Sequence, residues 1–407
     1  MLFTPSAPID ESDLFAGRQT QIRRLIEVVL ERGKHAVLYG ERGVGKTSLA
    51  KVFPMLFPSI VKKVLLFREQ IDPTDNFSSA WMKVFKDIPV QDMDGGTRHL
   101  ADNYQTQLTP DDVRRALEHA FKASDIPVVV IDEFDKSEEP DLRALTANAI
   151  KNLSDYAVNV TVIIVGVADD IGELIDKHES ISRCIEQIPM PRMSNDEMKE
   201  LLQKRLPRLG MKIEADALWK IITLARGLPA YVHLLGLHAT QDAIRLRRTV
   251  VTVSNVDSAI QRALAKSQES VQREYATATH TNRSDTLFRE VLLACALAQT
   301  DERGLFTPNA VVGPLSSILK RDIAIANFQN HLKKFIGDER GKILIRRGKE
   351  RAYKFRFRDP MMQPYVIMKG VEAGLIQANA LEVLSAPEQP QLQFPSTQRP
   401  AGKNGDG

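Results

Sequence analysis

Apolar stretches alternate with amphipathic stretches along the first half of the chain. Strand-length runs of mostly apolar residues span positions 35–39, 60–67, 127–131, 160–165 and 184–189. The segments between them, such as 21–31 and 142–153, place apolar residues three and four positions apart, which is typical of helices. Because strands that are apolar throughout are buried on both faces, the alternation predicts a parallel β-sheet covered by helices on both sides. We expect this α/β domain to occupy residues 1–190.

The chain becomes helical after residue 190. Residues 191–269 contain amphipathic helices, and the first of these begins with Ser194 and Glu197, which are spaced as a capping box. This segment predicts a small helical lid. The next segment, 270–285, is polar, so we expect it to be a linker.

Residues 286–370 predict a third domain. Helices are expected at 286–299, 309–319 and 322–336, and they are followed by hairpin strands at 342–347 and 352–358. Three helices and a two-stranded hairpin make a winged helix. After it we expect a short helix over 371–385 and a disordered tail over 386–407, where Pro, Gln and Gly dominate.

Residues 40–47 carry the clearest chemical signal. Their sequence, GERGVGKT, matches G-x-x-x-x-G-K-[ST] and lies between a predicted strand and a predicted helix. In such a P-loop, consecutive backbone N–H groups surround the β-phosphate at a helix N-terminus that favours anions. We expect Lys46 to reach the β- and γ-phosphates of ATP and to act in catalysis, and Thr47 to bind Mg²⁺. The other expected nucleotide contacts in the loop are Gly40, Gly43, Val44, Gly45 and Ser48.

The strand expected at 127–131 ends in two acidic residues, Asp132 and Glu133. An acidic turn can follow any strand. Downstream of a P-loop, however, this arrangement favours a Walker B motif. Asp132 would then hold Mg²⁺ through water, and Glu133 would be the base that orients the attacking water.

With these motifs the chain resembles the AAA+ ATPases, and among them the origin-recognition initiators and the STAND-type switch ATPases. The resemblance covers about residues 14–369. It implies a P-loop NTPase fold of AAA+ type, with an α/β core, a helical lid and a C-terminal winged helix. It also implies that Gly17 and Arg18, in a motif of the form apolar-x-G-R, lie against the adenine.

Three further positions take their meaning from the resemblance. Asp169 stands where initiators carry an amide as sensor 1, but a carboxylate cannot donate to a γ-phosphate, so it would position water or another residue instead. Arg183 stands at the place of an arginine finger that reaches a neighbouring subunit, and the alternative is a surface arginine before an edge strand. Pro229 ends Gly-Leu-Pro, which is similar to the G-x-P motif whose proline packs on the base or sugar in STAND proteins. No sensor 2 arginine follows it before His233, which favours a switch over rapid turnover.

Positive charge is concentrated near the C-terminus. Residues 320–369 hold fourteen Lys or Arg against five Asp or Glu, while the whole chain carries only +3, which leaves −6 for the rest. One stripe of the third helix carries Asn327, Asn330, His331 and Lys334, and the hairpin carries Arg346, Arg347, Lys349, Arg351, Lys354, Arg356 and Arg358. These side chains could contact base edges and phosphates of duplex DNA. They could equally form a solvated face, or a winged helix that contacts protein.

Composition excludes several classes of protein. The chain is 43% hydrophobic and 26% charged, and it has no apolar run of the roughly 18 residues that a membrane span needs. We therefore expect a cytoplasmic protein without a membrane partner. Cys184 and Cys295 lie far apart and have no metal-binding motif beside them, so we expect reduced thiols and no structural metal.

Together these features predict an ATP-binding and ATP-hydrolysing switch that uses Mg²⁺. Its nucleotide state would control self-assembly and duplex DNA binding through the winged helix, as in the initiators or in ATPases that regulate transposition. The alternative is a STAND-type signalling ATPase, for example in phage defence, whose winged helix contacts a partner protein.

Overall fold

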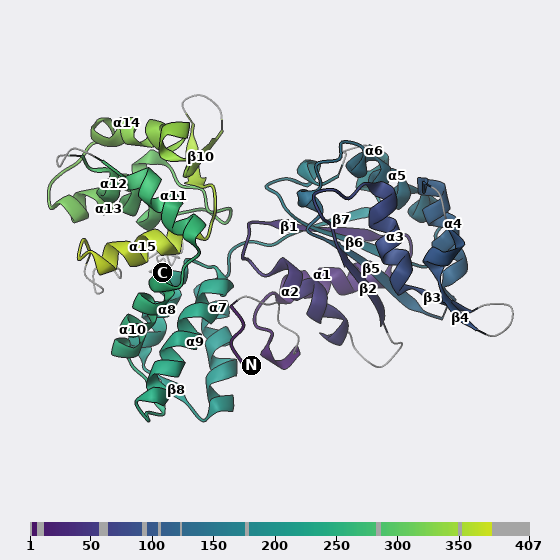
Figure 1. Ribbon diagram of the computed structural model, residues 1–407, viewed down its shortest axis with the longest axis horizontal. Coiled ribbons are helices and arrows are strands. Elements are labelled where there is room, and N and C mark those ends of the chain that lie inside the picture. Colours follow the sequence, from purple (N-terminus) through teal and green to yellow (C-terminus); the bar gives the residue numbers. More distant parts are fainter. Residues whose placement is uncertain are drawn as a thin grey trace, which may run out of the picture.

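The computed structural model describes residues 2–5, 12–56, 64–91, 96–104, 107–122, 124–175, 179–281, 286–348 and 352–376. Figure 1 shows three units: an α/β core, a helical lid beside it, and a C-terminal unit that stands against the lid. None of the helices in these ranges is both long and apolar enough to cross a membrane.

The α/β core is built on a parallel five-stranded sheet with strand order β2-β5-β6-β1-β7. Its strands are β1 (His35–Gly40), β2 (Val64–Gln70), β5 (Ile126–Asp132), β6 (Thr161–Val167) and β7 (Ile185–Pro189). The sequence predicted the parallel sheet, and four of its strands are found within two residues of the expected bounds. β2 begins later than the strand expected at 60–67, and residues 60–63 lie outside the described ranges.

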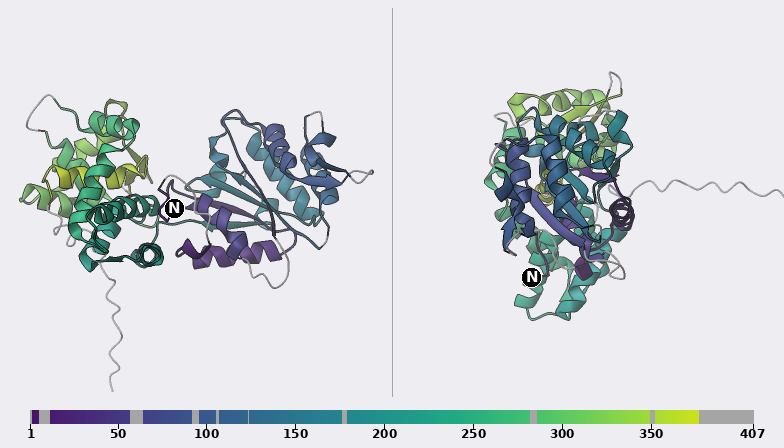
Figure 2. Two further views of the ribbon diagram at one scale, coloured as in Figure 1. Left: turned by 60° about the horizontal axis from the view of Figure 1, so that its bottom comes forward. Right: turned by 90° about the vertical axis from the view of Figure 1, so that its right-hand side faces the viewer.

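Helices cover both faces of the sheet, as Figure 2 shows in its left-hand view. Alternate residues of β5 point to opposite faces, so Val128 and Val130 join one hydrophobic cluster while Val129 and Ile131 join the other. The first cluster includes α1 (Gln19–Leu30) and α2 (Lys46–Val52), and the second includes α3 (Phe77–Asp87), α4 (Pro110–Ala120) and α5 (Leu142–Asp155). The core is completed by a short hairpin, β3 (Pro89–Gln91) with β4 (Thr97–His99), and by α6 (Glu179–Ser182).

The lid contains α7 (Asn195–Arg205), α8 (Ala215–Ala225), α9 (Pro229–Arg245) and α10 (Val253–Ala265). Two short strands, β8 (Lys212–Ile213) and β9 (Val250–Val251), pair in parallel at its far end. The predicted capping box is present, because Ser194 accepts a hydrogen bond from the Glu197 N–H and Glu197 accepts one from the Ser194 N–H.

Most of the expected linker is a helix, so this prediction was wrong. Helix α11 runs from Glu269 to Thr279. Helical spacing places Val271, Tyr275 and Ala278 on one side of α11, where they pack on the first hydrophobic cluster. There the Tyr275 ring meets the Tyr365 ring edge to face, with centroids 5.6 Å apart. These few apolar residues stabilise the helix through tertiary packing, which the mostly polar sequence concealed.

The C-terminal unit has the order of elements expected for a winged helix. It contains α12 (Phe288–Leu297), α13 (Pro308–Leu319), α14 (Ile325–Phe335) and a hairpin of β10 (Leu344–Arg347) and β11 (Lys354–Phe357). A last helix, α15 (Met362–Glu372), begins earlier than the short helix expected over 371–385 and packs against α8, α10 and α12. Because it is covered from several sides, it is apolar on most of its surface. The expected tail at 386–407 lies outside the described residues.

Candidate nucleotide site

The P-loop joins β1 to α2, and its shape depends on glycine. Gly40 has φ 151° and Gly45 has φ 94°, in a region that other residues rarely adopt. A side chain at Gly40 would also meet the Met190 carbonyl oxygen, 2.4 Å from the position of a Cβ atom. The loop leads into the N-terminus of α2, where free backbone N–H groups and the helix dipole favour an anion.

Lys46 is buried beneath the P-loop. Its Nζ donates hydrogen bonds to the carbonyl oxygens of Gly40 and Glu41, each at 2.8 Å. Burial lowers the pKa of Lys46 to about 8, although Asp135, Asp132 and Glu41 act in the opposite direction. A phosphate would offer this ammonium a charged acceptor, which binds more strongly than a carbonyl oxygen. The Lys46 ammonium can therefore leave these two carbonyl oxygens and bind a phosphate instead when a nucleotide enters the site.

Thr47 and Asp132 meet at the carboxyl end of β5. Thr47 Oγ1 lies 3.3 Å from Asp132 Oδ1, and Asp132 is only 1% exposed. A hydroxyl and a carboxylate are the oxygen ligands that Mg²⁺ accepts beside nucleotide phosphates. The two residues therefore fit a Mg²⁺ ion, and their role as its ligands stays a prediction.

Arg68 belongs to this site, although sequence reasoning missed it. Strand β2 lies beside β5, and Arg68 Nη2 donates to the other Asp132 oxygen, Oδ2, at 2.7 Å. Arg68 Nε is buried and has no hydrogen-bond partner among the described residues. The strand expected at 60–67 stopped one residue short of Arg68. Only the order of the strands, which no local pattern reveals, brings it to Asp132.

Glu133 follows β5 in a left-handed backbone conformation, with φ 57°. This conformation costs a residue with a side chain on the order of 1–2 kcal/mol. The Glu133 carboxylate lines the cavity described below and accepts a hydrogen bond from Lys136 Nζ at 2.6 Å. Strain of this kind persists only where the surrounding structure enforces it, and the role of Glu133 as the base stays a prediction.

Asp135 is a second acidic residue that the sequence analysis did not single out. It lines the same cavity, and its Oδ1 accepts a hydrogen bond from the Val167 N–H at 2.7 Å. This bond ties the segment after β5 to the end of β6. The close spacing of Asp132, Glu133 and Asp135 was the signal that could have identified it.

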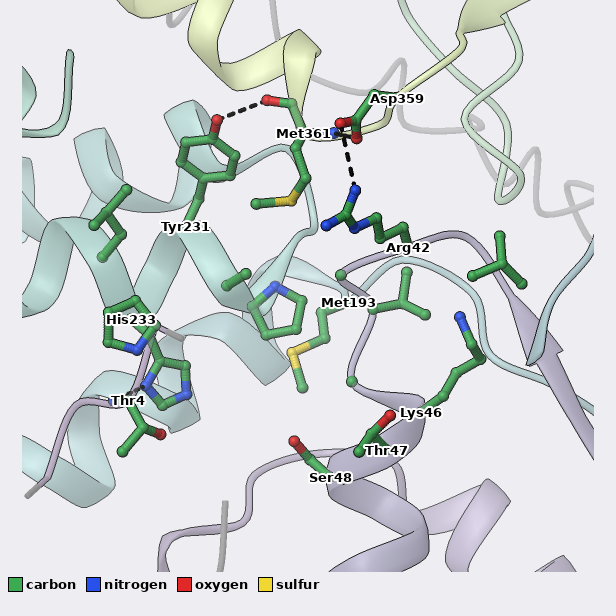
Figure 3. Close-up of a pocket in the computed structure, with 18 of the residues that line it drawn as sticks. Thr4, Arg42, Lys46, Thr47, Ser48, Met193, Tyr231, His233, Asp359 and Met361 are labelled. Carbon is green, nitrogen blue, oxygen red and sulfur yellow. Dashed lines mark hydrogen bonds and ion pairs between the residues drawn. The ribbon is translucent and has the colours of Figure 1, made fainter. Parts of the chain in front are cut away.

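All three units line one cavity of about 680 Å³. The lid contributes Pro229 and Tyr231, and the C-terminal unit contributes Asp359 and Met361. Figure 3 shows two contacts that join the units there: the Tyr231 hydroxyl donates to the Met361 carbonyl at 2.6 Å, and Arg42 lies 3.9 Å from Asp359. Sites for small molecules have volumes of about 300–1,000 Å³, so the cavity has the size of a ligand site.

The N-terminal segment closes part of the cavity, which the sequence did not indicate. Thr4 and Pro5 line it, and the Thr4 N–H donates to His233 Nδ1 at 3.1 Å. Burial lowers the pKa of His233 to about 3, with a further contribution from Arg205, so the imidazole stays neutral and can accept this bond. Phe3 is buried against the lid beside Gly236.

The other nucleotide residues expected from the sequence surround the same cavity. Arg18 lines it, and the Arg18 side chain donates to the Val44 carbonyl at 2.9 Å. Gly17 lies behind the wall, where its N–H donates to Glu200 of the lid at 3.1 Å. The predicted site residues that line the cavity are Arg18, Gly43, Val44, Gly45, Lys46, Thr47, Ser48, Asp132, Glu133 and Pro229.

Comparison with known proteins agrees with this geometry. A family model described as novel STAND NTPase 1 matches residues 8–310. The chain belongs to this family. It is therefore a P-loop NTPase of the STAND type.

Solved structures with a similar fold have low sequence identity. A Walker-type ATPase of Pyrococcus abyssi is 16% identical with a TM-score of 0.54, over 90% of this chain and 99% of that one. A Cdc6 protein from Pyrobaculum aerophilum is 15% identical with a TM-score of 0.48, over 92% and 98%. The comparison with curated proteins found no similar protein.

In this STAND NTPase, four residues predicted to act at the nucleotide lie outside the cavity lining, namely Gly17, Gly40, Asp169 and Arg183. Arg183 is exposed and forms an ion pair with Asp155. Asp169 binds Arg356 and Arg347 of the hairpin. Asp169 was expected to position water or another residue, and in the structure two arginines lie against it.

The candidate DNA-binding face of α14 is only partly exposed. Asn330 and Lys334 face solvent, but the Asn327 side chain caps the helix by accepting the Ala324 N–H at 2.9 Å. His331 was expected on the exposed stripe, but this was wrong, because its ring packs edge to face on Phe288 with centroids 4.9 Å apart. The apolar neighbour stabilises the half-buried ring.

The hairpin cations are engaged by other residues of the NTPase. Lys354 binds Asp301 at 2.8 Å, Arg358 binds Glu274 at 3.1 Å, and the Arg346 guanidinium lies over the Tyr353 ring at 4.3 Å. Lys349 and Arg351 lie outside the described residues. These cations thus have partners within the protein, while the side chains of Arg347, Lys354 and Arg358 are about half exposed.

Proposed function

We propose that this STAND NTPase binds and hydrolyses ATP with Mg²⁺ and uses its nucleotide state to control self-assembly and duplex DNA binding. The observation that carries the proposal is the shared cavity. The C-terminal unit, which holds the candidate DNA contacts, supplies Asp359 and Met361 to the wall of the nucleotide site.

This arrangement supports coupling because Asp359 lies two residues after the end of β11. A nucleotide that changes the position of Asp359 or Met361 would act directly on the base of the hairpin. A ligand shifts a two-state equilibrium by its difference in affinity for the two states, and here the C-terminal unit would differ between them.

Each residue of the site has a role in this proposal. Lys46 and the P-loop amides bind phosphate, while Thr47 and Asp132 hold Mg²⁺, which supplies positive charge to the phosphates when bound. Glu133 accepts a proton from the attacking water. Gly17, Arg18 and Pro229 hold the base and sugar between the core and the lid.

Self-assembly would place Arg183 at the nucleotide of a neighbouring subunit. Its side chain is exposed, so it can be withdrawn from Asp155 at little cost, because surface ion pairs contribute about 0–1 kcal/mol. An arginine supplied to the transition state in this way can increase the rate by roughly 10³–10⁵.

Duplex DNA would be bound by the exposed polar groups of α14 together with the hairpin cations. Asn330 and Lys334 stand on the solvent side of α14. An amide can pair with an adenine edge, and a cation can pair with guanine or phosphate.

The test is duplex DNA binding by the full chain with ATP, with ADP and without nucleotide, at two salt concentrations. We expect ATP to tighten binding, and we expect Lys334→Glu to weaken it and to reduce its salt dependence. Lys199→Glu, which makes the same charge change on an exposed lysine of the lid, is the matched control. DNA affinity that is identical in all nucleotide states, or absent throughout, would refute the proposal and favour a winged helix that contacts protein.

A further inference from the structure

A single carboxylate of the core holds two arginines of the hairpin. Asp169 Oδ2 accepts from Arg356 Nη2 at 2.7 Å and lies 3.0 Å from Arg347 Nη2, while Asp169 Oδ1 accepts from Arg356 Nη1. The Arg356 side chain is 13% exposed and that of Asp169 is 21% exposed. Arg356 therefore makes a two-point contact that is largely shielded from water.

The strand register gathers positive charge on the face of the hairpin that meets the core. Arg347 is paired with Lys354, and Arg356 follows two positions later in β11, so all three side chains share one face. Like charges at such positions repel one another. Asp169 and Asp301 together provide two negative charges against three positive ones. The hairpin face therefore requires acidic partners and still retains an excess positive charge.

Asp169 is fixed close to the nucleotide cavity. It follows β6, whose last residues Gly166 and Val167 line the cavity, and its own N–H donates to Glu173 at 3.3 Å. On the other side of the hairpin, Asp359 lines the same cavity near Arg42. The hairpin region thus contacts the core at two places, Asp169 with Arg356 and Asp359 with Arg42, and Figure 1 shows the hairpin on the flank of the C-terminal unit that faces the core.

We propose that Arg347 and Arg356 form one anion-binding site with two exclusive occupants: Asp169 in the state described here, and a backbone phosphate of duplex DNA once the hairpin leaves the core. The guanidinium fork of Arg356 fits a carboxylate and a phosphate equally well, because both offer two oxygens in one plane. Asp169 occupies the fork formed by one N–H of each Arg356 Nη atom, and the side chain is only 13% exposed, so a phosphate cannot bind this fork at the same time.

This inference rests on the proposed DNA binding and adds its regulation. Asp169 acts as an internal substitute for phosphate, so the docked hairpin does not contribute these arginines to DNA. This would explain why Asp169 stands where an amide is expected at sensor 1, because a neutral amide carries no charge with which to replace a phosphate.

The test combines DNA affinity with a distance measurement that needs no DNA. Spin labels on Asn148→Cys in the core and Gln329→Cys in α14 report whether the hairpin unit is docked, and both native cysteines are buried away from the label. Asp169→Asn should broaden the distance distribution and tighten nucleotide-free DNA binding by about tenfold, the scale of one shielded charge pair. Asp196→Asn, the same change on an exposed residue of the lid, should do neither.

A second part of the test exchanges the charges of Asp169 and Arg356. Asp169→Arg combined with Arg356→Asp and Arg347→Gln should restore the docked distance, because the ion pair is rebuilt and no second arginine faces position 169, but DNA affinity should stay low. If Asp169→Asn releases the hairpin without changing DNA affinity, while Lys334→Glu still weakens DNA binding, the shared site is refuted and the proposed function stands. If no form of the protein binds DNA, the proposed function and this inference both fail.

Discussion

Arg192 is the residue whose loss should most clearly separate the three units. Its Nε donates to Glu41 of the P-loop at 2.6 Å, and its Nη1 donates to Gln363 of α15 at 2.6 Å and to the Arg226 carbonyl at 3.3 Å. The side chains of Arg192 and Glu41 are 9% and 6% exposed. One guanidinium thus joins the core, the lid and the C-terminal unit.

Arg192→Met would leave the Glu41 carboxylate buried and without its cation. Removing one partner of a buried ion pair costs about 3–5 kcal/mol, because the remaining charge keeps its desolvation penalty. Arg24→Met is the matched control. Arg24 pairs with Glu186 at 2.5 Å, but both side chains are about one-third exposed, so its loss should cost about 0–1 kcal/mol.

Two tryptophans allow the units to be followed separately during urea unfolding. Trp81 is buried in the core and Trp219 lies in α8 of the lid, so Trp219→Phe and Trp81→Phe leave one reporter each. Arg192→Met should lower the midpoint and separate the two transitions, whereas Arg24→Met should leave them together. Adding Glu41→Gln should recover part of the loss, because no charge then stays buried. Equal effects of Arg192→Met and Arg24→Met would show that the junction does not stabilise the assembly of units.

Three other predictions concern catalysis, metal and pH. Glu133→Gln should keep ATP binding and reduce hydrolysis by at least about 100-fold, with exposed Glu139→Gln as control, and a parental rate would exclude Glu133 as the base. Arg68 competes with Mg²⁺ for Asp132 Oδ2. Arg68→Met frees this oxygen, so the Mg²⁺ concentration that gives half-maximal nucleotide binding should fall, and an unchanged concentration would contradict the competition. Burial lowers the pKa values of His35 and His233 to about 3, so the unfolded chain binds more protons below pH 6.5 and stability falls as the pH decreases from 6.5 towards 3. Each should cost about 2 kcal/mol at pH 5, and His35→Gln should flatten the pH dependence of thermal unfolding where exposed His119→Gln does not.

Local patterns predicted most of the fold. Apolar runs identified the sheet because a parallel sheet buries both faces of its strands, and Val128 to Ile131 are all at most 1% exposed. The P-loop followed from glycines and a lysine at fixed spacing. Helix α11 was missed because three apolar residues among polar ones give a weak periodic signal until another surface covers them.

The candidate site was less predictable, because its other parts come from distant positions in the chain. Arg68 meets Asp132 only through the order of β2 and β5, and Asp169 meets Arg356 across 187 positions. The described hairpin cations lie close together, as the sequence predicts, but their partners Asp169, Asp301 and Glu274 lie elsewhere. A charge pattern indicates which residues need a counter-charge, and only the fold decides which one they receive.

Glu41 connects the phosphate site to the C-terminal unit through its two ends. Its carbonyl accepts from Lys46, and its carboxylate holds Arg192, which in turn holds Gln363. A nucleotide that draws Lys46 away from that carbonyl removes one bond of Glu41. Glu41 also anchors α15 through Arg192, so the change at the P-loop can reach the C-terminal unit. Thermodynamic linkage is reciprocal. The factor by which bound ATP changes the equilibrium for release of the C-terminal unit equals the factor by which release changes the affinity for ATP. Asp169→Asn, which loosens the unit without touching the P-loop, should therefore change ATP affinity in the matching direction, by at most the factor by which ATP changes the docking equilibrium constant of the labelled parent, as measured by nucleotide titration. An ATP affinity that stays constant while the labels separate would show that the cavity and the hairpin are independent.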